Sequence, residues 1–204
     1  MNAEPVSPER EHRTPAPSQT DEELMLSFCR GSKETFGELF SRYKQPVFGF
    51  FRRRVRDQEH AEELTQETFL AVLRASSRYE PSALFRTYLY AVASKILSAH
   101  RRKTAFRAMF LGTASASHEP GLESSAHAEV VLRQALSKLQ AIDREILLLR
   151  EFELLSYAEI AEVMHLPVNT VRSRLFRARM GLRELLSAPV GKTSSELTPS
   201  EERI

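Results

Sequence analysis

The chain has 204 residues, of which 42% are hydrophobic and 27% are charged, and this is enough for one or two small globular domains. Its formal net charge of only +2 excludes a polycation that binds nucleic acid through bulk charge alone. A single cysteine excludes an internal disulfide and fits a reducing compartment, and no apolar run is long enough to span a bilayer. We therefore expect a cytoplasmic protein.

The first half of the chain predicts a polar tail followed by a helical domain. Residues 1–19 are polar and rich in proline, and we expect them to be disordered. Thr20 and Glu23 form a capping-box pattern, which is typical of the start of a helix. Apolar residues then recur at spacings of three and four, and Pro46 is expected to break or kink one of these helices because it lacks an N–H. The pattern predicts a helical domain over residues 20–104.

An acidic ridge marks one helix of this domain, predicted over residues 58–75 with Asp57 as its cap. Glu59, Glu63 and Glu67 follow one another at four-residue spacing, where like charges repel by roughly 0.2–0.5 kcal/mol for each pair. Such a ridge indicates a basic protein partner. The alternative is an ordinary solvated helix face.

The next predicted helix, over residues 84–103, combines aromatic and basic side chains. Its members are Phe85, Arg86, Tyr88, Tyr90, Lys95, His100, Arg101, Arg102 and Lys103. Aromatic faces and cations together can stack on unpaired bases and hold their phosphates. An equally good reading from the chemistry alone is that the aromatic residues belong to the core and the cations are solvated.

The second half of the chain predicts a linker, a second helical domain and a tail. Residues 105–126 contain a small, polar, turn-rich stretch that we expect to be a flexible linker. Residues 127–186 again carry helical periodicity, and residues 187–204 are polar and expected to be disordered. The expected fold is all-α, with two small helical domains, an N-terminal helical bundle and a C-terminal helix-turn-helix domain, joined by a flexible linker.

A helix-turn-helix pattern is the most informative feature of the second domain. Ser156 and Glu159 form a capping box for the first helix, and Pro167 marks the start of the second. His165 lies where a left-handed residue is expected in the turn, at a cost of about 1 kcal/mol. The second helix is predicted to bury Val168, Val171, Leu175, Ala178 and Leu182. Five arginines and no acid accompany these residues up to Arg183, as expected for a helix that enters the DNA major groove.

These residues resemble the bacterial sigma factors of the extracytoplasmic-function (ECF) group, within the sigma-70 family. The resemblance rests on three motifs in chain order: DQEHAEELTQETFL over residues 57–70, FRTYLY over residues 85–90 and TVRSRLFRAR over residues 170–179. It implies a protein that binds core RNA polymerase, recognises the upstream (−35) and downstream (−10) promoter elements and promotes DNA opening for transcription initiation. It also implies an anti-sigma partner, which could hold the protein at the membrane.

The resemblance carries roles to particular residues. Those matching the polymerase-binding motif are Glu63, Leu64, Gln66 and Glu67. Those matching the part that reads and melts the downstream element are Arg86, Tyr88, Lys95, Arg101 and Arg102. Those matching the upstream-reading face are Asn169, Thr170, Arg172, Ser173, Arg174, Phe176 and Arg177. The family often has tryptophan at Tyr88, asparagine at Lys95 and aspartate at Ala99, so the resemblance implies an unusual downstream element and weaker melting.

Two other classes of protein remain as alternatives. A free-standing helix-turn-helix regulator would bind a palindromic DNA site as a symmetric dimer, without polymerase. An enzyme with an accessory DNA-binding domain would need a catalytic constellation, and the sequence has no Gly-rich phosphate loop, nucleophile elbow or paired-cysteine metal site. We therefore expect neither enzymatic activity nor a cofactor, metal or small-molecule substrate.

Overall fold

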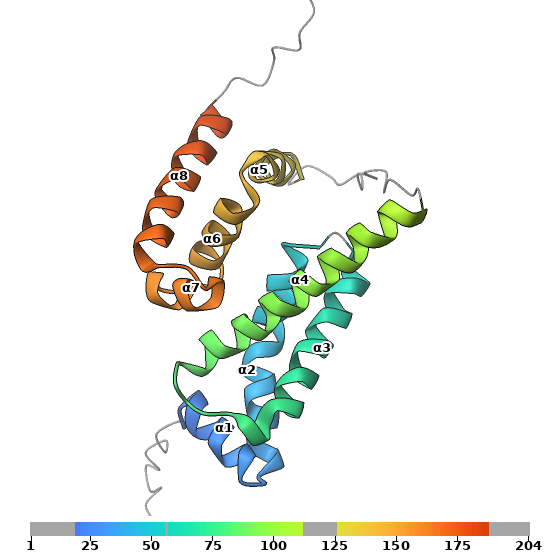
Figure 1. The fold of residues 1–204 in the computed structure, drawn as a ribbon, viewed down its shortest axis with the longest axis vertical. Coiled ribbons are helices and arrows are strands. Elements are labelled where there is room, and N and C mark those ends of the chain that lie inside the picture. The colour runs from blue at the N-terminus through green and yellow to red at the C-terminus, as the bar shows by residue number, and fades with distance from the viewer. Residues whose placement is uncertain (1–18, 56, 112–125, 188–204) are drawn as a thin grey trace, which may run out of the picture.

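The computed structural model describes residues 19–55, 57–111 and 126–187, and across these ranges it is all-α, as predicted (Figure 1). The first part of the chain forms α1 (Asp21–Cys29), α2 (Lys33–Arg52), α3 (Gln58–Ala75), the short 3-10 helix η1 (Ser76–Arg78) and α4 (Phe85–Leu111). The second part forms α5 (Ala126–Lys138), α6 (Ala141–Glu151), α7 (Tyr157–Met164) and α8 (Val168–Ser187).

Helices α1–α4 pack as a bundle around an aromatic core. Phe50, Phe51 and Phe85 are fully buried in it, and the rings of Phe50 and Phe51 meet edge to face with centroids 5.0 Å apart. The predicted start of α1 is confirmed, because the Thr20 hydroxyl accepts from the backbone N–H of Glu23 while the Glu23 carboxylate accepts from the N–H of Thr20.

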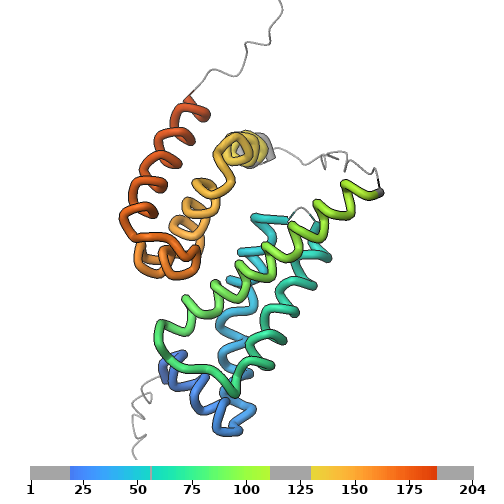
Figure 2. The backbone as a smooth tube through the Cα atoms, viewed as in Figure 1, coloured from blue at the N-terminus to red at the C-terminus, as the bar shows by residue number. Residues whose placement is uncertain are grey.

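One helix boundary predicted in this bundle is wrong, and of the break or kink predicted at Pro46 the break does not occur. Pro46 does not break its helix, because α2 continues through it to Arg52 and buries Val47, Phe50 and Phe51 just beyond it. Packing of this apolar face offsets the missing hydrogen bond. Helix α4 does not end near Lys103 but continues to Leu111, and Figure 2 traces its C-terminal end past the rest of the bundle. Residues 104–111 include alanine, arginine, methionine and leucine, which all favour helix.

The second domain forms the predicted helix-turn-helix. Ser156 and Glu159 make both capping-box hydrogen bonds at the start of α7. His165 ends α7 in the left-handed conformation, with φ 53° and ψ 47°. Val171, Leu175 and Ala178 are buried as predicted, and Leu182 is partly buried. Val168 was predicted to be buried and is not, since 40% of it is exposed at the first position of α8, before the helix reaches the core.

The two domains touch in this structure. Helix α7 packs against the first half of α4 (Figure 1), and one continuous cluster of buried apolar residues extends from α1 to α8. Residues 112–125 of the predicted linker lie outside the described residues, as do residues 1–18 and 188–204 of the two predicted tails.

Candidate functional site

The N-terminal half of α8 presents an exposed polar face. Asn169, Arg172, Ser173, Phe176 and Arg177 are all exposed, and their spacings of three and four place them on one side of the helix. Phe176 is 67% exposed, an unusual position for a large aromatic ring, which could touch the methyl group of a thymine. The face therefore presents two guanidinium groups, an amide, a hydroxyl and one aromatic ring to solvent. Thr170 lies at its edge and is partly buried.

Arg174 lies one turn after Thr170, at the edge of this face, and is directed toward α6. Its Nη1 donates to Oδ1 of Asp143 in α6 over 2.9 Å, and only 25% of its side chain is exposed. Asp143 itself is buried within the second domain. The arginine therefore neutralises a buried carboxylate and joins α8 to α6.

The residues predicted to read the downstream element divide between two faces of α4. Tyr88, Lys95 and Arg102 recur every seven residues and so form one stripe along the helix. Lys95 and Arg102 are exposed, whereas the Tyr88 ring packs on Tyr79 with centroids 5.2 Å apart. Burial raises the pKa of Tyr88, so its hydroxyl remains protonated at neutral pH.

Arg86 and Arg101 lie on the opposite side of α4 and contact the second domain. Arg86 donates from Nε and Nη2 to the two carboxylate oxygens of Glu159 over 2.6 and 2.7 Å. Arg101 Nη2 lies 3.7 Å from a carboxylate oxygen of Glu145. Burial would raise the pKa of Glu159, but the hydrogen bonds from Arg86 and Ser156 outweigh it and lower that pKa to about 2.

The acidic ridge on α3 is exposed, whereas one of the four residues predicted to bind polymerase is buried. Glu63, Gln66 and Glu67 all face outward. Leu64 is only 4% exposed and belongs to the core, so it holds the ridge in place from beneath. Leu70 was not predicted as a site residue, yet it is 46% exposed, one turn after Gln66 and Glu67. Its spacing from these two residues in the sequence already indicates that it shares their face of the helix.

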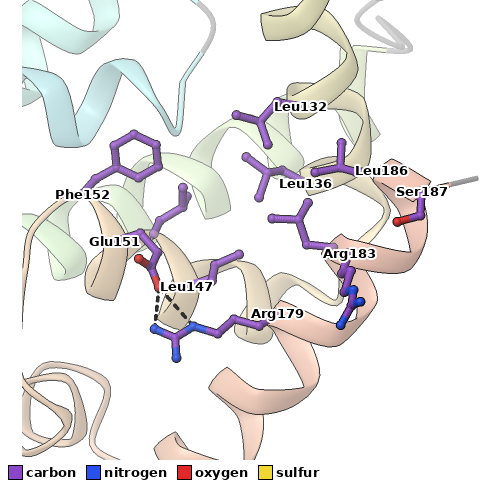
Figure 3. A pocket seen from close by; sticks show the side chains of 11 residues that line it. Leu132, Leu136, Leu147, Glu151, Phe152, Arg179, Arg183, Leu186 and Ser187 are labelled. Carbon is purple, nitrogen blue, oxygen red and sulfur yellow. Dashed lines mark hydrogen bonds and ion pairs between the residues drawn. The ribbon is translucent and has the colours of Figure 1, made fainter.

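An apolar groove of about 530 Å³ lies between α5, α6 and α8 (Figure 3). Leu132, Leu136 and Leu147 line it, and an ion pair between Arg179 and Glu151, 2.7 Å long, closes one side. It involves the C-terminal half of α8, whereas the exposed polar face occupies the N-terminal half. The sequence did not predict this groove, because it forms only where three helices that are apart in the sequence pack together.

Another exposed apolar surface was missed at the end of α4. Phe106, Met109 and Phe110 are between 59% and 75% exposed, and the two phenylalanine rings stack with centroids 4.4 Å apart. Their spacing of three and four residues is typical of one face of a helix. These residues lie within the predicted linker, so the sequence did not predict this surface.

The described residues bring together no group of three or more histidine, cysteine, aspartate or glutamate side chains suited to a metal ion. None of the helices in the described part of the chain is both long and apolar enough to cross a membrane.

Comparison with known proteins identifies two regions of the chain. Residues 39–107 match the model of sigma-70 region 2, and residues 129–182 match that of sigma-70 region 4. The chain is 34% identical over 184 residues to the RNA polymerase sigma-H factor of Pseudomonas aeruginosa, covering 82% of this chain and 94% of that one. It is 30% identical over 174 residues to the ECF RNA polymerase sigma-E factor of Haemophilus influenzae, covering 78% of this chain and 92% of that one.

Solved structures show the same fold. CnrH, in complex with the cytosolic domain of CnrY, matches with a TM-score of 0.66 and 24% identity over 83% of this chain and 98% of that one. The sigma factor RpoE of Bartonella quintana, in complex with the anti-sigma factor NepR, matches with a TM-score of 0.64 and 22% identity over 76% of this chain and 98% of that one. From its two matched regions and its full-length relatives, the chain belongs to the sigma-70 family of RNA polymerase sigma factors, in the ECF group.

Proposed function

We propose that this sigma factor divides its work among three surfaces: the acidic ridge of α3 for core RNA polymerase, the Tyr88–Lys95–Arg102 stripe of α4 for the downstream element, and the exposed face of α8 for the upstream element. It acts as a promoter-specificity subunit in the cytoplasm and not as an enzyme. An anti-sigma protein is a further partner, as NepR is for RpoE.

The observation that carries the proposal is the polar face at the start of α8. Arg172 and Arg177 are exposed at spacing five, with Ser173 and Phe176 between them. No acid lies in α8 before Glu184, so nothing on this helix neutralises the two arginines locally. Arginine forks suit guanine edges and phosphates, and the ring of Phe176 suits a thymine methyl. The N-terminus of α8 supports phosphate binding near Asn169.

The charge on α3 supports a different partner for the first domain. Glu63 and Glu67 are exposed and repel DNA, so this face suits a basic protein surface. Exposed Leu70 beside them adds an apolar contact of the kind that anchors protein interfaces. Both domains bound to one polymerase would read two promoter elements with high effective concentration, even if each contact alone is weak.

Titration of the purified protein with bacterial core RNA polymerase, followed by run-off transcription from a genomic library, tests the proposal. Tight binding to the core enzyme and a set of new start sites with shared upstream sequences are expected. Absence of core binding, with retardation of duplex DNA by the protein alone, would contradict it. A palindromic site and a stable dimer would then identify the free-standing regulator.

A further inference from the structure

Two histidines meet where α3 and α4 pack side by side (Figure 1). The ring of His60 in α3 and the ring of His100 in α4 have centroids 5.4 Å apart, with an angle of 60° between their planes. Histidine is the commonest metal ligand in proteins, through the lone pair of a neutral ring nitrogen. Two imidazoles that share a tetrahedral Zn²⁺ through bonds of about 2.0–2.1 Å have ring centres roughly 5 Å apart. The observed spacing therefore suits a shared metal ion.

Asp57 holds the His60 ring in one orientation. Its Oδ2 lies 2.7 Å from Nδ1 of His60, and its Oδ1 accepts from the backbone N–H of Glu59 over 2.9 Å, at the start of α3. The helix cap therefore fixes the carboxylate, and the carboxylate fixes the ring. When Nδ1 donates to Asp57, Nε2 keeps its lone pair. A carboxylate placed behind an imidazole in this way also makes the imidazole a stronger metal ligand.

Acidic side chains outnumber basic ones around the two rings. The carboxylates of Glu63 and Glu67, from the acidic ridge, act electrostatically on His100, and so does the ammonium of Lys103. Arg52 acts in the same way on the carboxylate that holds the other ring. Among these described residues, three carboxylates are balanced by only two basic side chains. The excess of negative charge attracts a divalent cation.

The pair of rings forms an open site. Among the residues that the structure describes, no third side chain joins these two in a ligand set, so water completes the coordination of an ion bound there. Imidazole is a good ligand for Zn²⁺, Ni²⁺ and Cu²⁺, whereas Mg²⁺ and Ca²⁺ prefer oxygen ligands. The chemistry of the two rings therefore selects a transition metal.

We propose that His60 and His100 bind a divalent transition-metal ion, such as Zn²⁺, between α3 and α4. The bound ion adds positive charge beside Glu63 and Glu67 of the acidic ridge. Because electrostatic attraction to a basic partner acts mainly on the association rate, the ion slows docking of this ridge to core polymerase. The effect on docking rests on the proposed function, whereas binding of the ion does not.

Calorimetric titration of the full chain with Zn²⁺ tests the site directly, in a Cys29→Ser background that removes the exposed thiol. His60→Gln and His100→Gln should each lower the affinity roughly tenfold or more, because each removes one of the two ligands. Asp57→Asn keeps a good N-cap for α3 but removes the charge behind His60, and it should cause a smaller loss. His165→Asn is the matched control, because it removes an exposed histidine elsewhere and asparagine tolerates the left-handed conformation. It should leave the affinity unchanged.

Electron paramagnetic resonance of the protein with one equivalent of Cu²⁺ counts the nitrogen ligands and needs no histidine variant. Two imidazole nitrogens are expected in the Cys29→Ser protein. Each histidine variant that remains folded by circular dichroism should show one. A signal from a single imidazole, or from oxygen ligands alone, in the protein with both histidines would overturn the site. Equal Zn²⁺ affinity with and without the two histidines would overturn it as well.

Surface plasmon resonance against immobilised core polymerase tests the effect on docking. Zn²⁺ should slow association of the Cys29→Ser protein several-fold and should leave the rate of His100→Gln unchanged. An unchanged rate at saturating Zn²⁺ would overturn the link between the ion and the acidic ridge. Absence of core binding in buffer with a chelator would instead contradict the proposed function, and the Zn²⁺ titration of the free protein would still give its answer.

Discussion

Arg174 of α8 donates a 2.9 Å hydrogen bond to Asp143 of α6, so one arginine of this helix is bound to its own domain. Arg177, three residues later, is exposed. Both residues are arginines of the same helix, yet one is paired with an acid of its own domain and the other is exposed to solvent. Comparing alanine variants of these two residues therefore separates the effect of losing an arginine on stability from the effect on DNA binding.

Arg174→Ala should destabilise the protein. The change leaves Asp143 buried without its cation, which costs about 1–3 kcal/mol. Urea unfolding followed by circular dichroism measures this, with a lower midpoint expected. Arg177→Ala should remain within about 0.5 kcal/mol of wild type because it alters an exposed position. Equal unfolding midpoints for Arg174→Ala and wild type would show that the ion pair adds nothing to stability.

Arg177→Ala should weaken promoter binding while binding to core polymerase persists. Loss of one arginine contact is expected to cost about 1–3 kcal/mol with a base or to reduce the salt slope by about 1 with a phosphate. Fluorescence anisotropy on promoter DNA at several salt concentrations distinguishes the two. Arg183→Ala, an exposed arginine nearer the C-terminus of α8, is the matched control. Loss of core binding with DNA binding intact would contradict the assignment of surfaces.

Glu67→Lys should impair docking to core polymerase without changing DNA binding by the second domain. The substitution reverses one charge of the exposed ridge, where electrostatic attraction to a basic partner acts mainly on the association rate. Surface plasmon resonance against immobilised core enzyme should show slower association. Glu184→Lys makes the same charge change on an exposed acid of α8 and should leave that rate unchanged. A normal holoenzyme with Glu67→Lys would count against the ridge.

The pairing of Arg86 with Glu159 should be lost only in acid. The pKa of Glu159 falls from its ordinary 4.5 to about 2 in the folded protein, so its charged form stabilises the fold above about pH 4.5. That contribution decreases as pH falls from 4.5 towards 2. Thermal unfolding of wild type and Glu159→Gln should therefore differ by a constant amount between neutral pH and about pH 5, then converge. Glu162→Gln, an exposed change on α7, should show no such convergence.

His165→Gly should stabilise the second domain. His165 ends α7 at φ 53°, where a side chain costs about 1 kcal/mol and glycine costs nothing sterically. The greater freedom of glycine in the unfolded chain offsets part of the gain. A rise of the unfolding free energy by up to about 1 kcal/mol is expected, whereas His165→Ala should give none. A loss of stability in His165→Gly would mean that the imidazole itself makes a contribution larger than the strain.

The sequence by itself determined the features whose hydrogen bonds are local. Both capping boxes, the Asp57 cap and the left-handed His165 follow from residues two to four apart, and the structure has all of them. The apolar spacing of α8 likewise predicted Val171, Leu175 and Ala178 in the core. At Pro46 the sequence predicted a break or kink because proline lacks an N–H, but packing of α2 decided that the helix continues.

Tertiary structure alone decided which charged residues are exposed and which are paired with distant acids within the protein. Arg86 meets a carboxylate 73 residues away, and Arg53 meets one 100 residues away. A basic residue reads the same in the sequence whether it is solvated, bound to phosphate or paired with a distant acid. Periodicity gives the side of a helix on which a residue lies but not what packs there. The ion pairs between the two domains and the groove between α5, α6 and α8 exist only because distant helices meet.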